Sequence, residues 1–112
     1  MNQRVLSRYE TPGGKTPFSD WLRSLKDRTA ASRIRRRLNR LELGNLGASR
    51  PVGQGVCELK LDFGPGYRIY LGQYGETIII LLCGGDKSTQ EEDIRLAKTY
   101  WEDFRRRNHE GE

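Results

Sequence analysis

Cysteine, histidine and long apolar runs are scarce in this sequence. Two of its 112 residues are cysteines, Cys57 and Cys83, and one is a histidine, His109. Both cysteines fall inside apolar segments, so we expect reduced core thiols rather than a disulfide. Two cysteines are too few for a cysteine-rich zinc site. A single histidine also makes a histidine-dependent catalytic centre improbable. We therefore expect no metal and no cofactor.

The apolar segments are also too short for a membrane protein. The longest run, Ile78 to Cys83, has six residues, whereas a transmembrane helix needs roughly 20. No signal peptide is visible in residues 1–10. We expect a cytoplasmic protein that makes no membrane contact.

Positive charge is in excess. Lysine and arginine together number 20 against 15 acidic residues, which gives a net charge of +5. This balance favours an anionic partner, most commonly nucleic acid, although the charge can also serve solubility alone. The length predicts one domain, spanning residues 1–112, with a core of modest size.

Apolar and polar residues alternate through residues 56–63 (V-C-E-L-K-L-D-F) and again through residues 67–71 (Y-R-I-Y-L). This period of two predicts two strands, and Gly64-Pro65-Gly66 between them predicts a three-residue hairpin loop. In that register Asp62 faces Arg68 and Lys60 faces Tyr70. One face of the hairpin is then apolar, with Leu59, Leu61, Phe63, Tyr67, Ile69 and Leu71. The other face carries a mostly cationic patch of Glu58, Lys60, Asp62, Arg68 and Tyr70.

The remaining elements follow from caps, turns and helical periodicity. Residues 3–9 predict a first strand, Thr16-Pro17 begins a first helix, and a second helix runs from Thr29 to about Leu43. Residues 44–55 are predicted as a loop, 72–76 as a turn and 77–83 as a central strand. Ser88 and Glu91 form a capping box that opens a last helix. The order predicts an α+β fold, with an N-terminal strand, two helices, a three-stranded meander in a mostly antiparallel sheet, and a C-terminal helix.

The second predicted helix separates apolar from basic residues. Four apolar side chains share one side, and four arginines, Arg33, Arg36, Arg37 and Arg40, share the opposite side. Each like-charged pair on a helix costs roughly a few tenths of a kcal/mol in helix stability. Binding to a phosphate backbone would offset this repulsion and explain why the arginines are crowded on one side. A solvated face fits the same pattern.

Four short motifs in this order resemble a known family. They are T-P-F-x-x-W-L at residues 16–22, E-L-K at 58–60, G-P-G-Y-R-I-Y at 64–70 and G-G-D-K-S-T-Q-x-x-D-I-x-x-A at 84–97. Together with the arginine-rich helix they resemble the type II toxins of the RelE/ParE superfamily, in the "addiction module killer protein" branch close to HigB-like toxins. The resemblance covers nearly the whole chain and implies a RelE-like fold.

The resemblance implies a ribosome-dependent, metal-independent mRNA endonuclease that inhibits translation. It also implies a cognate helix-turn-helix antitoxin and an operator DNA that the toxin–antitoxin complex binds. Carried over by position, the basic site is Lys60 and Arg68 on the strands with Lys87 in the following loop. Relatives often have arginine where this chain has Lys60, which keeps the charge but lacks a bidentate fork.

RNA cleavage without metal requires attack by the 2′-OH on the adjacent phosphate, which yields a 2′,3′-cyclic phosphate. Arg68 suits stabilisation of the phosphorane, and Lys60 or Lys87 suits donation of a proton or added charge. Glu58 is a candidate base, with ion pairing to a neighbouring lysine as its alternative role. Tyr70 is a candidate for stacking on bases. The arginine face of the second helix is expected to dock on ribosomal RNA.

Two other functions remain open at this point. Relatives in the same superfamily inhibit DNA gyrase, but they lack the cationic cluster of Lys60, Arg68 and Lys87. A non-catalytic nucleic-acid-binding module would use the same basic surfaces only to hold phosphates.

Overall fold

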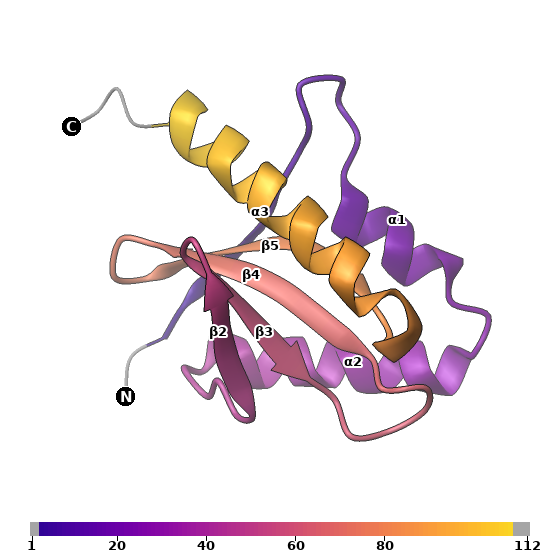
Figure 1. Cartoon of the computed structure of the whole chain (residues 1–112). Helices are drawn as coiled ribbons and strands as arrows, with labels where there is room; N and C mark the ends of the chain where they lie inside the picture. The colour runs from indigo at the N-terminus through magenta and orange to yellow at the C-terminus, as the bar shows by residue number, and fades with distance from the viewer. Residues whose placement is uncertain (1–2, 109–112) are drawn as a thin grey trace.

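The computed structural model describes residues 3–108, so that His109 lies outside the described residues. These residues form an α+β fold of five strands and three helices (Figure 1). In chain order the elements are β1 (Val5–Arg8), α1 (Pro17–Ser24), α2 (Arg28–Glu42), β2 (Ser49–Gly53), β3 (Val56–Lys60), β4 (Arg68–Tyr74), β5 (Ile78–Gly85), a short 3₁₀ turn η1 (Lys87–Thr89) and α3 (Gln90–Arg107).

The strands form one mixed sheet in the order β1-β5-β4-β3-β2. β1 runs parallel to β5, and the other neighbours are antiparallel. The expected meander is present as β3, β4 and β5, and the sheet is mostly antiparallel as predicted. No helix within residues 3–108 combines the length and apolarity needed to cross a membrane.

β2 is an additional strand, and the prediction of a loop over residues 44–55 was wrong there. Ser49–Gly53 pairs antiparallel with β3 through a two-residue turn at Gln54 and Gly55. Both turn residues have positive φ, 57° and 87°, as the tight primed turns of hairpins require. Pro51 is tolerated because β2 is an edge strand, where one row of backbone N–H groups needs no partner.

The register of the β3–β4 hairpin differs from the prediction by two residues. Lys60 lies opposite Arg68 and Glu58 lies opposite Tyr70, so the expected pair of Asp62 with Arg68 does not form. The cause is a longer loop, because the Leu61 N–H donates to the Tyr67 carbonyl at 2.9 Å and leaves five residues between them. A shift of two preserves which face each side chain occupies.

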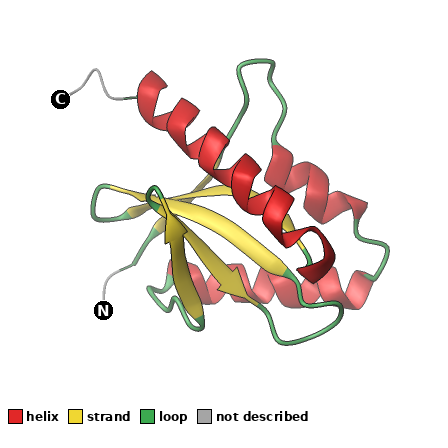
Figure 2. Cartoon of the chain, viewed as in Figure 1, coloured by secondary structure: helices red, strands yellow, loops and turns green. Residues whose placement is uncertain are grey.

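Each face of the sheet carries its own core. α1 and α2 cover one face, with Phe18, Ile34 and Leu41 packed on Leu59 and Ile69. α3 covers the other face, as Figure 2 shows with the long helix in front of the strands. The predicted apolar stripes are confirmed on both sides. The face expected to be a polar patch is therefore mostly a second core, with Tyr9, Val56, Tyr70, Ile80, Leu82, Cys83, Ala97 and Trp101.

Gly72, predicted in a turn, and Gly84, predicted just beyond a strand, both lie inside strands. Gly72 belongs to β4, and a Cβ there would lie 2.4 Å from the Trp101 ring of α3. Gly84 belongs to β5, and a Cβ there would lie 2.3 Å from the Trp21 ring of α1. Each glycine gives a tryptophan room to lie against the sheet. The chain turns between β4 and β5 beyond Tyr74 instead.

The start of α3 also differs from the predicted capping box. Asp86 caps the 3₁₀ turn η1 ahead of the helix, because its carboxylate accepts from the Ser88 N–H at 2.8 Å and the Ser88 hydroxyl at 2.6 Å. Thr89, and not Ser88, is the N-cap of α3. One 3₁₀ turn then precedes Gln90, the first residue of α3. Gln90 thereby lies at the end of the sheet, over β3 and β4.

Candidate functional site

Three basic residues predicted for the site lie at the end of the sheet where α3 begins. Lys60 on β3 is paired with Arg68 on β4, and Arg68 is paired with Gly85 on β5. Lys87 follows in η1, and its N–H donates to the Pro65 carbonyl at 3.3 Å. A Cβ on Gly66 would lie 3.1 Å from Arg68 Nη1 and 3.4 Å from Lys87 Cβ. The structure therefore places Lys60 beside Arg68 and the start of the Lys87 side chain near the Gly66 turn. Lys87 lines a neighbouring hollow with residues 88–92 and Arg95, and not the one that Lys60 and Arg68 line.

Arg68 is the buried member of this group, with 7% of its surface exposed. Its Nη1 donates to the Gly66 carbonyl at 2.6 Å. Its Nε lies 3.7 Å from a carboxylate oxygen of Glu58 and, within residues 3–108, is a buried nitrogen that lacks a hydrogen-bond partner. This Nε is enclosed beside Glu58, so it holds Arg68 by charge attraction and is not itself open to an incoming anion.

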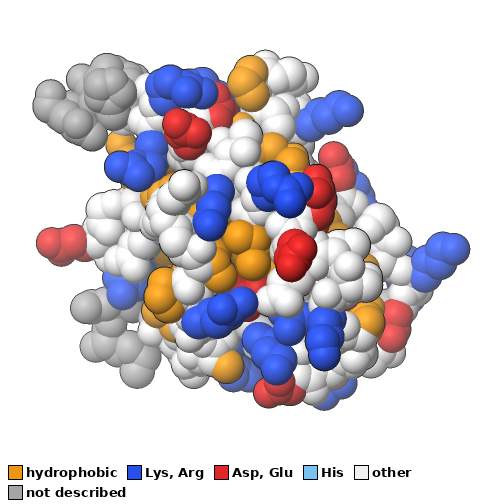
Figure 3. Space-filling model, in the orientation of Figure 1, with side chains coloured by type: hydrophobic (Ala, Val, Ile, Leu, Met, Phe, Trp, Pro, Cys, Tyr) orange, Lys and Arg blue, Asp and Glu red, His pale blue; other side chains and the backbone are white. Residues whose placement is uncertain are grey.

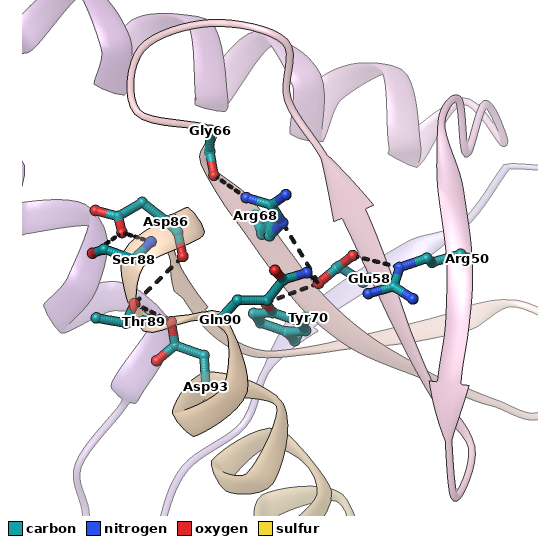
Figure 4. A network of polar contacts seen from close by, with 10 residues as sticks. All are labelled: Arg50, Glu58, Gly66, Arg68, Tyr70, Asp86, Ser88, Thr89, Gln90 and Asp93. Carbon is teal, nitrogen blue, oxygen red and sulfur yellow. Dashed lines mark hydrogen bonds and ion pairs between the residues drawn. The ribbon is translucent and has the colours of Figure 1, made fainter.

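Glu58 is buried beside Arg68 and accepts three hydrogen bonds. Arg50 Nε lies 2.9 Å from Oε1, while the Tyr70 hydroxyl and Gln90 Nε2 lie 3.0 Å and 2.9 Å from Oε2. Figure 4 shows these three side chains reaching Glu58 from β2, β4 and α3. Burial alone raises the pKa of Glu58, but the hydrogen bonds from Gln90, Arg50 and Tyr70 hold that pKa below its usual value.

This geometry corrects the predicted role of Glu58 as a base. An ionised carboxylate with a lowered pKa and three donors around it is a poor proton acceptor. The alternative role, pairing with a cation, is the one observed, although the partners are Arg50 and Arg68 rather than a lysine. Glu58 orients the cations around it.

Tyr70 does not contribute a stacking surface, contrary to the prediction. Its side chain is fully buried under α3, and burial together with the Glu58 carboxylate raises the pKa of its hydroxyl. Tyr67 is buried on the opposite face of the sheet. The error arose because the sequence pattern placed Tyr70 on a polar face without showing that α3 covers it.

Sequence reasoning missed Arg50 and Gln90. Arg50 lies on β2, which was predicted as a loop, and Gln90 stands at the end of the G-G-D-K-S-T-Q motif as the first residue of α3. Both line a shallow hollow of about 320 Å³ over Glu58 and Arg68. The remaining lining residues are Ala48, Ser49 and Lys60. The motif was a usable signal for Gln90, because it places this amide one turn after Asp86.

Comparison with known proteins gives one relative of this chain. A search against protein-family models finds no match. The chain is 48% identical over 81 residues to a protein of Haemophilus influenzae (strain ATCC 51907 / DSM 11121 / KW20 / Rd) described as an uncharacterized protein. The matched region covers 72% of this chain and 82% of the Haemophilus protein. This chain belongs to the same family as that protein. The family thus spans most of the fold described above.

A second basic surface of this protein lies beside the hollow at Arg68. A groove of about 490 Å³ runs between α2 and the end of β3. Figure 3 shows basic side chains gathered in the lower part of the view, where the end of β3 passes in front of α2. The lining residues are Arg33, Arg36, Arg37, Arg40, Ala48, Lys60, Leu61, Asp62 and Phe63.

The four arginines of α2 that line this groove differ in their roles. Arg33, Arg36 and Arg40 are exposed, and the Arg33 guanidinium lies over the Phe63 ring at 4.4 Å. Arg37 is buried instead, and it donates to the carbonyls of Asn45 and Leu46. Burial and the neighbouring Arg40 lower the pKa of Arg37. The prediction that Arg37 joins the docking face was therefore wrong, because this residue ties the loop after α2 to the helix.

Within residues 3–108, no group of three or more histidine, cysteine, aspartate or glutamate side chains is placed to hold an ion. Cys57 and Cys83 are both free thiols and lie in separate cores. An incoming molecule would meet the cations that line the hollow, Arg50, Lys60 and Arg68.

Proposed function

We propose that this protein is the toxin of a type II toxin–antitoxin system, a ribosome-dependent and metal-independent mRNA endonuclease that inhibits translation. In this proposal the fold is RelE-like, and the chain falls in the addiction module killer branch of the RelE/ParE superfamily, close to HigB-like toxins. The observation that carries the proposal is that Lys60 and Arg68 line one hollow at the end of the sheet, with the Cβ of Lys87 close to the Gly66 turn that Arg68 contacts.

The proposed reaction is an internal transfer at one phosphate of the RNA. The 2′-OH gives its proton to solvent water as its oxygen attacks phosphorus, the bond from phosphorus to the 5′ oxygen breaks, and that oxygen gains a proton. The products are a 2′,3′-cyclic phosphate and a free 5′-hydroxyl. Arg68 stabilises the negative charge that develops on the phosphorane oxygens, as fixed donors do at other oxyanions. Lys60 and Lys87, both exposed at the rim, supply further charge and a proton for the leaving oxygen.

The buried ion cluster gives Arg68 its position in this scheme. Glu58 holds Arg68 from one side, and Arg50, Tyr70 and Gln90 hold Glu58 in turn. Glu58 is then a positioning residue. Glu58 is taken up by its three hydrogen bonds, and Asp62 lines the groove beside α2 rather than the hollow at Arg68. Orientation of the RNA by the ribosome therefore supplies much of the rate.

The same proposal assigns the partners. The protein acts in the cytoplasm on mRNA and the ribosome, a cognate helix-turn-helix antitoxin neutralises it, and the toxin–antitoxin complex binds operator DNA. No cofactor takes part.

The test is cleavage of an mRNA on programmed ribosomes, mapped by primer extension, with a ribosome-free control. Arg68→Ala should lower cleavage by about 10²- to 10³-fold, because it removes the donor to the phosphorane. Since Arg68 is buried, Arg68→Lys and the exposed Lys60→Ala accompany it, and both should cut poorly while unfolding at a midpoint close to the wild type. Arg23→Ala, an exposed change on α1, is the matched control.

Two results would contradict the proposal. One is undiminished cutting by Arg68→Lys and Lys60→Ala. The other is the absence of cuts by a folded wild-type protein that is toxic to cells, which would direct attention to inhibition of DNA gyrase.

A further inference from the structure

We infer that the α2 groove binds the RNA strand that is cut, so that the groove and the hollow at Arg68 form one continuous track for a single-stranded RNA. This inference rests on the proposed function and differs from docking of α2 on ribosomal RNA. It names which surface holds the substrate beyond the cleaved phosphate.

The first observation is continuity. Ala48 and Lys60 line both the groove and the hollow. Lys60 is also the residue paired with Arg68 across β3 and β4. An RNA strand with one phosphate at Arg68 therefore passes Lys60 as it leaves the hollow. The groove begins at that point and continues along α2.

The second observation is charge that has no internal partner. Arg23 on α1 and Arg95 on α3 each pair with a carboxylate on their own helix. Within residues 3–108, Arg33, Arg36 and Arg40 of α2 form no such ion pair, although all three line the groove. One carboxylate, Asp62, lines it with them. Exposed guanidinium groups held side by side without counter-charges are suited to phosphate oxygens.

The third observation is spacing and shape. Arg36 and Arg40 are four residues apart, which is about 6 Å along a helix that rises 1.5 Å per residue. This suits contact with neighbouring phosphates of an extended strand. At the end of the groove, Arg33 lies over Phe63 and offers a planar cation on which a base can stack. Buried Arg37 fixes the adjoining wall by holding the loop carbonyls of Asn45 and Leu46.

These features together favour the substrate strand as the occupant. The groove is concave, is lined by cations along one helix and shares Ala48 and Lys60 with the hollow that Arg68 lines. A surface that served only to dock the ribosome would not need to meet that hollow.

The test measures binding of short RNA without ribosomes. Fluorescently labelled, 2′-O-methylated single strands of mixed sequence, three and nine nucleotides long, are titrated with the protein at several salt concentrations. The methyl groups prevent 2′-OH attack, so binding is measured apart from cleavage. The groove variant is Arg36→Gln with Arg40→Gln, and the matched control is Arg23→Gln with Arg95→Gln, which removes the same charge elsewhere.

The wild type and the control should bind the nine-nucleotide strand more tightly than the three-nucleotide strand. The groove variant should lose most of that gain, weaken about tenfold on the longer strand, and show a salt dependence shallower by about 1 to 2 units of slope. Sedimentation with ribosomes that carry no mRNA should be equal for the groove variant and the control.

Three outcomes would overturn the inference. The wild type could fail to bind the longer strand, or the groove variant and the control could bind it equally well. In the third, the groove variant alone would bind more weakly to ribosomes that carry no mRNA. The last outcome would assign α2 to ribosomal RNA instead. Groove-dependent binding without any cleavage on programmed ribosomes contradicts the proposed function alone, so the two failures are distinguishable.

Discussion

Glu58 determines how the cations at the end of the sheet are arranged. Its carboxylate is 3% exposed and touches groups from β2, β4 and α3. A buried charge is stable when it is paired and hydrogen-bonded, and loss of a partner leaves a desolvation cost uncompensated. The position of Arg68 therefore depends on residues that need not touch an incoming molecule.

Gln90 offers a direct test of this dependence. Gln90→Leu keeps similar bulk but removes the amide donor to Glu58 Oε2, so we expect a loss of about 1 to 3 kcal/mol in unfolding free energy. Because Arg68 is then less well fixed, kcat for cleavage on ribosomes should fall about tenfold, with a smaller change in KM.

The matched control is Gln73→Leu, which changes an exposed glutamine on β4 in the same way. Loss of stability in Gln90→Leu with kcat unchanged would mean that Gln90 only supports the fold.

The charged residues of the site could be predicted from the sequence, but which of its side chains are buried could not. The motifs and the hairpin pattern identified Lys60, Arg68 and Lys87, and the structure places Lys60 beside Arg68 and the start of the Lys87 side chain near the Gly66 turn. The burial of Tyr70 depends on where α3 crosses the sheet, which no local pattern of β4 reveals. The ion pair of Glu58 with Arg50 depends on β2, whose glycine and proline content resembles a loop.

At the scale of elements, α3 is held against the sheet by tight packing at a glycine. Gly72→Ala would place a Cβ 2.4 Å from the Trp101 ring, so the helix or the strand must shift. We expect a loss of about 1 to 3 kcal/mol, as for other overpacked cores, measured as a lower urea midpoint.

Gly13→Ala is the control for Gly72→Ala, because the nearest atom to a Cβ there is 3.9 Å away. It should change the unfolding free energy by less than about 0.5 kcal/mol. Equal midpoints for the two variants would show that α3 adjusts without cost.

The same packing explains which element boundaries were predicted correctly. The stripes of α1, α2 and α3 follow the helical period, and the structure places these helices close to the predicted limits. Gly72 was predicted in a turn and Gly84 just beyond a strand, because glycine often marks turns and strand ends, whereas here each accommodates a tryptophan ring. A single sequence does not reveal which helix faces a given glycine.

At the scale of the whole molecule, both faces of the sheet are covered, so the hollow at Arg68 lies at one end of the sheet and not on a face. α1 and α2 cover one face and α3 covers the other. Charged side chains that begin on the strands can then reach solvent only at the rim, where Lys60 and Lys87 are exposed. The α+β class and the helix order followed from the sequence, while this confinement required the position of α3.

The buried ion cluster also makes the stability of the whole molecule depend on pH. The pKa of Glu58 is lower in the folded protein than its ordinary value of about 4.3. The unfolded chain therefore binds a proton first as pH falls, and the contribution of Glu58 is complete above about pH 5 and is lost as pH falls through the folded pKa. In urea unfolding between pH 7 and pH 3, wild-type stability should decline more steeply than that of Glu58→Gln.

The comparison with Glu58→Gln isolates this one carboxylate. Asp86 and Asp103, whose pKa values are also lowered, and Asp93, whose pKa is raised, are present in both proteins. The difference in unfolding free energy between the wild type and Glu58→Gln should therefore shrink steadily as pH falls from 6 to 3. A difference that stays constant over this range would mean that Glu58 has the same proton affinity in the folded and unfolded chains, and that the hydrogen bonds from Gln90, Arg50 and Tyr70 do not favour its charged form.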